Sequence, residues 1–91
     1  MYQGPGFYLH YKGSFYQALG LAVVEADLSL VVVYHPIPGS DNAKKLERFP
    51  AEYMPSFWSR PLDDFNAIVE EDETGNIHRF VWVEEDEVLA R

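Results

Sequence analysis

The stretch FYLHYKGSFYQALGLAVVE, residues 7–25, decides the fold. Its first six residues are dense in aromatic side chains, and in an extended chain successive side chains point to opposite faces. We expect two sets of side chains along this first strand: Phe7, Leu9 and Tyr11 point one way, and Tyr8, His10 and Lys12 point the other. If the first set faces the core, His10 faces solvent or a groove; the alternation alone does not decide which set is buried.

The residues that follow extend this strand into a meander. A second strand is predicted over residues 15–25, where Gly20 indicates a bulge or bend. The segment LSLVVVYHP, residues 28–36, is rich in β-branched residues and predicts a third strand. Because short loops join the three strands, they are expected to pair as antiparallel neighbours.

The second half of the chain adds shorter elements. We predict a short helix near residues 40–50, one helical turn after Pro61, and a hairpin from the runs 66–71 and 77–84 around a Gly75-Asn76 turn. About five short strands with little helix describe an all-β (mainly β) domain that forms a small barrel or a strongly curved sheet.

Size and composition indicate one small domain, residues 1–91. Hydrophobic residues make up 47% of the chain, and six Phe, six Tyr and two Trp can supply a packed core. The chain has no cysteine, which excludes disulfides and thiolate metal sites. We find neither a signal-peptide pattern nor an apolar run of about 18 residues, so we expect a soluble cytoplasmic protein with no membrane segment.

The net charge of −8 is unevenly distributed. Residues 70–91 carry eight acidic residues against two arginines, so most of the negative charge lies in the last quarter of the chain. We expect these acids to form a solvated hairpin and tail. No basic stretch suited to duplex phosphates is visible, which argues against binding of duplex nucleic acid.

Several motifs together resemble a family of small bacterial domains of unknown function. The matching stretches are GFYLHYKGSFYQALGLA (6–22), VVY (32–34), WSRPLDDF (58–65) and RF (79–80). The resemblance implies an SH3-like barrel of about five antiparallel strands, and it implies no established activity. Typical members are shorter between the second and third of these stretches, so residues 36–57, with the predicted helix, are interpreted as an insertion.

Two aromatic-rich stretches supply the candidate site. Trp58 and Arg60 lie two residues apart on an extended segment, so they project from one face, where they could stack on a planar group or hold an anion. The candidate ligand groove combines them with four residues of other strands: Tyr8, His10, Lys12, Tyr34, Trp58 and Arg60. In an alternative interpretation, Trp58 fills the core and Arg60 pairs with Asp63 or Asp64.

Function is predicted as a non-catalytic binding module for a small molecule or a peptide. The histidines lie on separate segments without a ligand-like spacing, so we predict no metal site. The sequence shows no partner that would orient the His10 ring, so we predict no catalytic residue. We also predict no cofactor. Two alternatives stay open: a nucleotide or single-stranded nucleic-acid binder, for which no basic groove is visible, and a small hydrolase that uses His10. Apolar residues in the segment 49–57 would provide an interface for a homo-oligomer if they are exposed.

Overall fold

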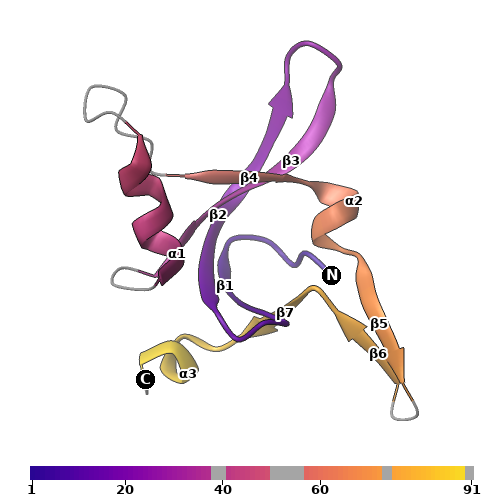
Figure 1. Cartoon of the computed structure of the whole chain (residues 1–91). Helices are drawn as coiled ribbons and strands as arrows, with labels where there is room; N and C mark the ends of the chain where they lie inside the picture. Colours follow the sequence, from indigo (N-terminus) through magenta and orange to yellow (C-terminus); the bar gives the residue numbers. More distant parts are fainter. Residues whose placement is uncertain (38–40, 50–56, 73–74, 90–91) are drawn as a thin grey trace.

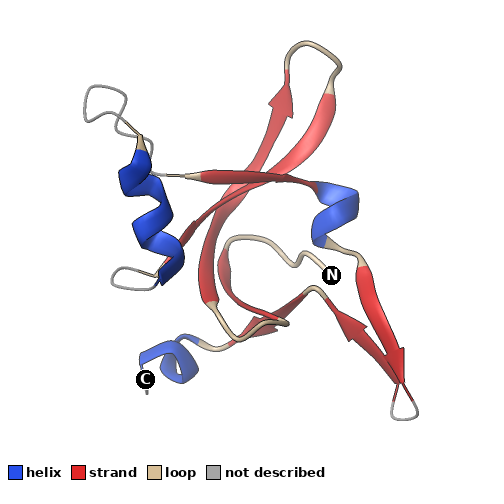
Figure 2. Cartoon of the chain, viewed as in Figure 1, coloured by secondary structure: helices blue, strands red, loops and turns tan. Residues whose placement is uncertain are grey.

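A computed structural model describes the chain except for residues 38–40, 50–56, 73–74 and 90–91. Strands dominate and the helical segments are short (Figure 2). The strands are β1 (Gly6–His10), β2 (Phe15–Val24), β3 (Ser29–Pro36), β4 (Trp58–Pro61), β5 (Ile68–Asp72), β6 (Gly75–His78) and β7 (Phe80–Val83). The helical segments are α1 (Asp41–Lys44), the 3₁₀ turn η1 (Lys45–Arg48), α2 (Leu62–Phe65) and α3 (Glu85–Leu89). No described helix is long and apolar enough to cross a membrane.

The strands form one five-stranded antiparallel sheet, in the order β4-β3-β2-β1-β7, and a separate β5-β6 pair. The predicted meander of the first three strands is confirmed, and so is the bulge, because the β2-β3 register shifts between Ala18 and Gly20. The mainly β class is also confirmed. In the described strand pairing, β4 and β7 remain edges, so no closed barrel is found. Figure 1 shows the β2-β3 hairpin projecting from the body, and α2 linking β4 to the β5-β6 hairpin.

The predicted strand over residues 77–84 breaks at Arg79. On its N-terminal side β6 pairs with β5, whereas on its C-terminal side β7 pairs with β1. The Arg79 N–H donates to the Ala67 carbonyl, and the Arg79 carbonyl accepts from the Tyr11 N–H. The backbone of this one residue therefore joins the two sheets, and the bend interrupts the predicted alternation of the strand.

The predicted hairpin turn at Gly75-Asn76 is wrong. These two residues belong to β6 and pair with Asp72 and Glu71. The connection between the paired residues falls at residues 73–74, outside the described residues. Gly75 has a φ of +133°, which a glycine adopts readily, so its conformational freedom serves the start of a strand rather than the turn.

An aromatic cluster forms the core, and Tyr8 is the residue of the first strand that is buried in it. Its buried members are Tyr8, Ala18, Val32, Tyr34, Phe65 and Phe80. The Phe65 and Phe80 rings stack with centroids 4.1 Å apart, and Tyr8 meets Phe65 edge-on. Tyr8 can be fully buried because its hydroxyl donates to the Gly4 carbonyl and accepts from the Gln3 N–H, both at 2.8 Å.

Gly6 and Gly20 give a matched test of close packing. Both have strongly positive φ values, +150° and +155°, but a Cβ on Gly6 would lie 2.5 Å from the Trp82 ring, whereas one on Gly20 would meet nothing within 4 Å. We expect Gly6→Ala to lower the unfolding free energy by about 1–3 kcal/mol more than Gly20→Ala does, because only the first adds a clash to the backbone strain. Urea unfolding measures both variants, and equal losses would contradict this packing.

Candidate functional site

Two adjoining cavities lie where β1, β2, β4 and the bend at Arg79 meet. The first, of about 240 Å³, is called the basic cavity, and its lining residues are His10, Tyr11, Lys12, Ser14, Tyr16, Lys45, Arg60 and Arg79. The second, of about 140 Å³, is called the aromatic cavity, and its lining residues are Tyr16, Tyr34, Lys45, Trp58 and Arg60. Tyr16, Lys45 and Arg60 line both, so the two cavities are neighbours.

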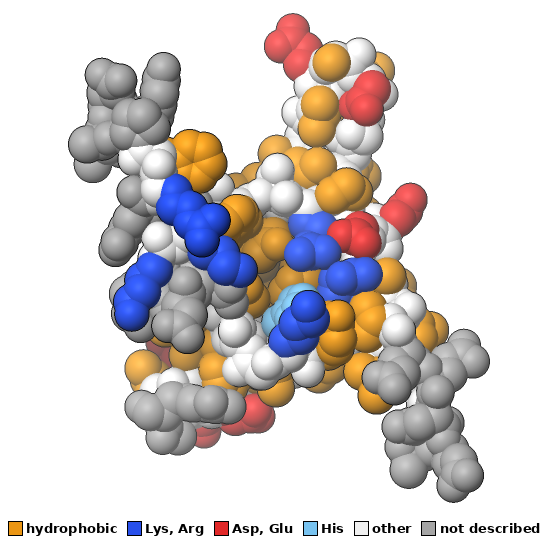
Figure 3. All heavy atoms as spheres, in the orientation of Figure 1, with side chains coloured by type: hydrophobic (Ala, Val, Ile, Leu, Met, Phe, Trp, Pro, Cys, Tyr) orange, Lys and Arg blue, Asp and Glu red, His pale blue; other side chains and the backbone are white. Residues whose placement is uncertain are grey.

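Positive charge is concentrated at the basic cavity. Four of the seven Lys and Arg residues in the chain line it, and none of its described lining residues is acidic. Figure 3 shows Lys and Arg side chains gathered on one face, with hydrophobic side chains between them and much of the acidic surface nearer the edges of the view. The net charge of −8 therefore does not describe this cavity, which four cations line and where Asp64 pairs with the two arginines.

Asp64 holds both arginines of the basic cavity. One of its carboxylate oxygens, Oδ2, lies 2.7 Å from Arg60 Nη1, and the other, Oδ1, lies 3.4 Å from Arg79 Nη2. Arg79 Nε also donates to the Asp64 backbone carbonyl at 3.1 Å. Arg60 lies near the end of β4 and Asp64 lies in the single helical turn of α2 that follows, so this turn brings the carboxylate back within reach of Arg60.

The Arg60 guanidinium is fixed on three sides. Its Nε donates to the Tyr34 hydroxyl at 3.1 Å, and its Cζ lies 5.6 Å from the centre of the Phe80 ring. Burial works against the charge, but the interactions with Tyr34 and Asp64 outweigh it and raise the pKa of Arg60 above its ordinary value. Among the described residues, none hydrogen-bonds to Arg60 Nη2 or Arg79 Nη1. Each guanidinium is thus oriented and keeps one nitrogen that can donate to a ligand.

His10 is a neutral member of the site at neutral pH. Burial, followed by the positive charges of Arg60, Arg79 and Lys12, lowers the pKa of His10 below its ordinary value of 6.5. The Lys12 N–H donates to His10 Nδ1 at 3.2 Å, which leaves the proton of the neutral ring on Nε2. The ring also packs against Phe80, with centroids 4.9 Å apart. His10 can therefore offer one N–H to an anion without adding a charge of its own.

The lowered pKa of His10 predicts how stability depends on pH. The unfolded chain binds the His10 proton more tightly than the folded protein does, so folding is penalised where only the unfolded chain is protonated. We expect full stability above pH 6.5 and a loss of stability as the pH falls from 6.5 toward the lower pKa that His10 has in the folded protein. The loss should be smaller in His10→Gln. Urea midpoints at pH about 7.5 and about 5 measure this difference, with His35 and His78 common to both proteins. Equal losses would contradict the environment assigned to His10.

Most of the predicted site residues meet at these cavities. Five of the six line one or both of them: His10, Lys12, Tyr34, Trp58 and Arg60. Tyr8 is the exception, because its ring is fully buried in the core and lines neither cavity. The alternative interpretation of an intramolecular ion pair also holds, since Arg60 pairs with Asp64. An arginine held by its own carboxylate can still line a cavity.

Three residues line the cavities without having been predicted as site residues: Arg79, Tyr16 and Lys45. Arg79 belongs to one of the family-like motifs, but the predicted straight strand gave no reason to aim it at Arg60. Lys45 comes from η1, inside the segment interpreted as an insertion. Trp58, a predicted site residue, is half-buried against the core cluster, and its Nε1 is buried without a hydrogen-bond partner among the described residues.

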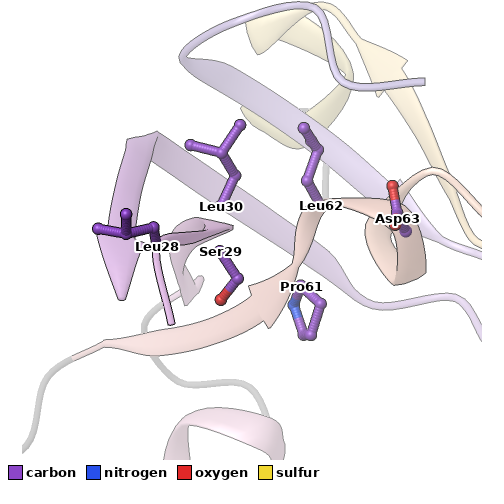
Figure 4. Close-up of a pocket in the computed structure, with 6 residues that line it drawn as sticks. All are labelled: Leu28, Ser29, Leu30, Pro61, Leu62 and Asp63. Atoms are coloured by element: carbon purple, nitrogen blue, oxygen red, sulfur yellow. The ribbon is translucent and has the colours of Figure 1, made fainter. Parts of the chain in front are cut away.

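A third cavity, of about 370 Å³, lies between the end of the β2-β3 hairpin and the start of α2 (Figure 4). Its lining residues are Leu28, Ser29, Leu30, Pro61, Leu62 and Asp63. It is larger than the basic cavity, but Asp63 is its only charged lining residue among those described. Volume alone does not make a site, and we place the candidate site where charged and aromatic groups converge.

In the described part of the chain, no group of three or more His, Cys, Asp or Glu could hold a metal ion. The titratable side chains that do converge are mainly cations, which repel metal ions and attract anions.

Comparison with known proteins identifies a family. Residues 6–82 match the model of a family described as a protein of unknown function, DUF1653. The chain therefore belongs to this family, which confirms the expected resemblance to a family of unknown function. It is similar to a crystal structure of a DUF1653 protein from Bordetella bronchiseptica, with 31% identity, a TM-score of 0.65, and coverage of 89% of this chain and 87% of that chain. No curated protein matches the chain.

Proposed function

We propose that this member of the DUF1653 family is a non-catalytic binding module that holds a small anionic ligand in the basic cavity. The observation that carries the proposal is the gathering of four of the seven Lys and Arg residues around one cavity of an acidic protein. Hydrogen bonds between charged donors and a carboxylate or phosphate are about twice as strong as neutral ones. Asp64 already orients both guanidinium groups, so binding would not have to order them.

The surroundings of His10 favour binding over catalysis. A general base works best when a third group, often a carboxylate, orients its second nitrogen. The described hydrogen bond of the His10 ring is with the Lys12 backbone N–H, and the nearby charges that affect it are positive. Such a ring suits donation of a hydrogen bond to an anion better than removal of a proton from a substrate.

Inorganic phosphate provides the first test. We expect calorimetric titration at low salt to show phosphate binding that weakens as salt is added, because the attraction is between exposed charges. Lys12→Gln should weaken this binding, whereas Arg48→Gln should not. Both changes remove one positive charge from the chain, but only Lys12 lines the cavity. Binding that is absent, or that responds equally to the two changes, would contradict the proposal.

The same test can be extended to a peptide ligand. A carboxylate is the anion that a peptide C-terminus or an acidic side chain would present, and acetate is its simplest probe. Acetate binding stronger than phosphate binding would direct the search toward peptides. Self-association through residues 49–57 also stays a proposal: Phe49 and Phe57 are more than half exposed, and residues 50–56 lie outside the described residues.

The SH3-like barrel is likewise kept as a proposal. It is supported by the approach of the two sheet edges, since Arg60 of β4 lies over the ring of Phe80 in β7. Nuclear Overhauser contacts between backbone amides of β4 and β7 would establish closure, and their absence would leave the sheet open.

A further inference from the structure

The aromatic cavity adjoins the basic cavity, and the two together limit the shape of a ligand that could fill both. Their volumes, about 240 and about 140 Å³, each fall short of the roughly 300 Å³ at which ligand pockets usually begin. Because Tyr16, Lys45 and Arg60 line both, the two cavities are neighbours, and a ligand large enough to fill a usual pocket would have to span both. Such a ligand needs an anionic end for one cavity and a flat end for the other.

Two partly exposed aromatic rings, Tyr16 and Trp58, make the second cavity suited to a flat group. Tyr34, a buried core residue that also lines the cavity, meets Tyr16 edge-on with ring centroids 5.2 Å apart. Nucleic-acid bases stack on such side chains because every base has a π-face. Arg60, which lines both cavities, can contribute a guanidinium plane beside them.

The basic cavity suits a phosphate monoester better than a carboxylate. It offers the ammonium groups of Lys12 and Lys45 and one guanidinium nitrogen from each of Arg60 and Arg79. His10 can add its Nε2–H. A phosphate monoester has three terminal oxygens and nearly two negative charges, whereas a carboxylate has two oxygens and one charge. The number of donors and the positive charge both match the phosphate more closely.

We infer that the two cavities together bind a mononucleotide, with its phosphate in the basic cavity and its base in the aromatic cavity. This inference rests on the proposed anion-binding function. A single nucleotide is favoured over a strand, because the cavities are small and the chain as a whole carries a charge of −8, which repels a polyanion.

The test compares AMP, adenosine, inorganic phosphate and a short oligothymidylate by calorimetry at one low salt concentration. We expect AMP to bind at least about tenfold more tightly than phosphate, since base stacking adds to phosphate binding. Adenosine should bind more weakly than AMP. Trp58→Leu should bring the ratio of AMP affinity to phosphate affinity toward one, whereas Arg48→Gln should leave that ratio unchanged. Tyr16→Leu replaces Trp58→Leu if the latter fails to give a folded amide spectrum.

Each outcome separates this inference from the proposed function. Phosphate binding without a preference for AMP overturns the mononucleotide and keeps the anion site. Equal binding of AMP and adenosine also overturns it, because the phosphate would then contribute nothing. An oligothymidylate that binds more tightly than AMP assigns the site to single strands instead. Binding of none of the four probes overturns both the inference and the proposed function.

Discussion

Phe80→Ala is expected to lower the unfolding free energy by about 3–5 kcal/mol, because it removes a ring from the centre of the aromatic core. Phe80 is 1% exposed and stacks on Phe65, and rings of Tyr16, Tyr34 and His10 surround it. Its truncation opens a cavity among these rings. For a domain whose total stability is of the order of 5–15 kcal/mol, this loss leaves a marginal fold.

The control for this change is Phe57→Ala. The Phe57 side chain is 56% exposed, so the same truncation should cost no more than roughly 0.5 kcal/mol. Guanidinium unfolding followed by tryptophan fluorescence measures both variants. Similar losses at the two positions would mean that the aromatic cluster is not the core of this domain.

Arg79→Met is expected to weaken phosphate binding by about ten- to a hundredfold, which corresponds to the roughly 1.5–3 kcal/mol of a hydrogen bond to a charged group. Methionine keeps much of the length and apolar character of the arginine stem, so the change removes mainly the guanidinium. Arg79 is held by both the carboxylate and the backbone carbonyl of Asp64. Its loss therefore removes a donor that is already oriented, which an exposed lysine would not replace.

A second substitution separates charge from orientation at this position. Arg79→Lys keeps the positive charge but lacks the planar fork that contacts Asp64 at two points, so we expect it to recover only part of the affinity. Calorimetry with inorganic phosphate measures the wild type and both variants, with Arg48→Met as the control. Wild-type affinity in Arg79→Met would contradict the role given to this arginine.

Local patterns predicted the strands well but not the faces of the first one. The alternation over residues 7–12, the β-branched run of β3 and the glycine at position 20 each report a property of neighbouring residues, and the structure confirms the elements that they predict. Which face of β1 is buried depends on residues outside the strand. Tyr8 is accepted in the core because the residues before β1 satisfy its hydroxyl, and no pattern within the strand shows this.

The candidate site was only partly predictable because its residues meet through bends. The spacing of Trp58 and Arg60 on one strand correctly placed both at a common cavity. Arg79 reaches the site because the chain changes sheets there, which a continuous alternating pattern conceals. The net charge was a poor guide to this site, because it is a sum over the whole chain that includes the acids of residues 70–91. It does not show that Lys12, Arg60 and Arg79 converge on one cavity.

The most direct test of the central claim is a ¹H–¹⁵N correlation spectrum of the wild-type protein, titrated with inorganic phosphate at constant low salt. The basic cavity predicts saturable shifts at the backbone amides of residues 10–14, 45, 60 and 79, and at the side-chain Nε–H groups of Arg60 and Arg79. The amides of the β2-β3 hairpin end, near Asp27, should stay unchanged because no cation of the cavity lies there. An unchanged spectrum, or shifts spread evenly over every exposed Lys and Arg, would mean that this cavity is not an anion site.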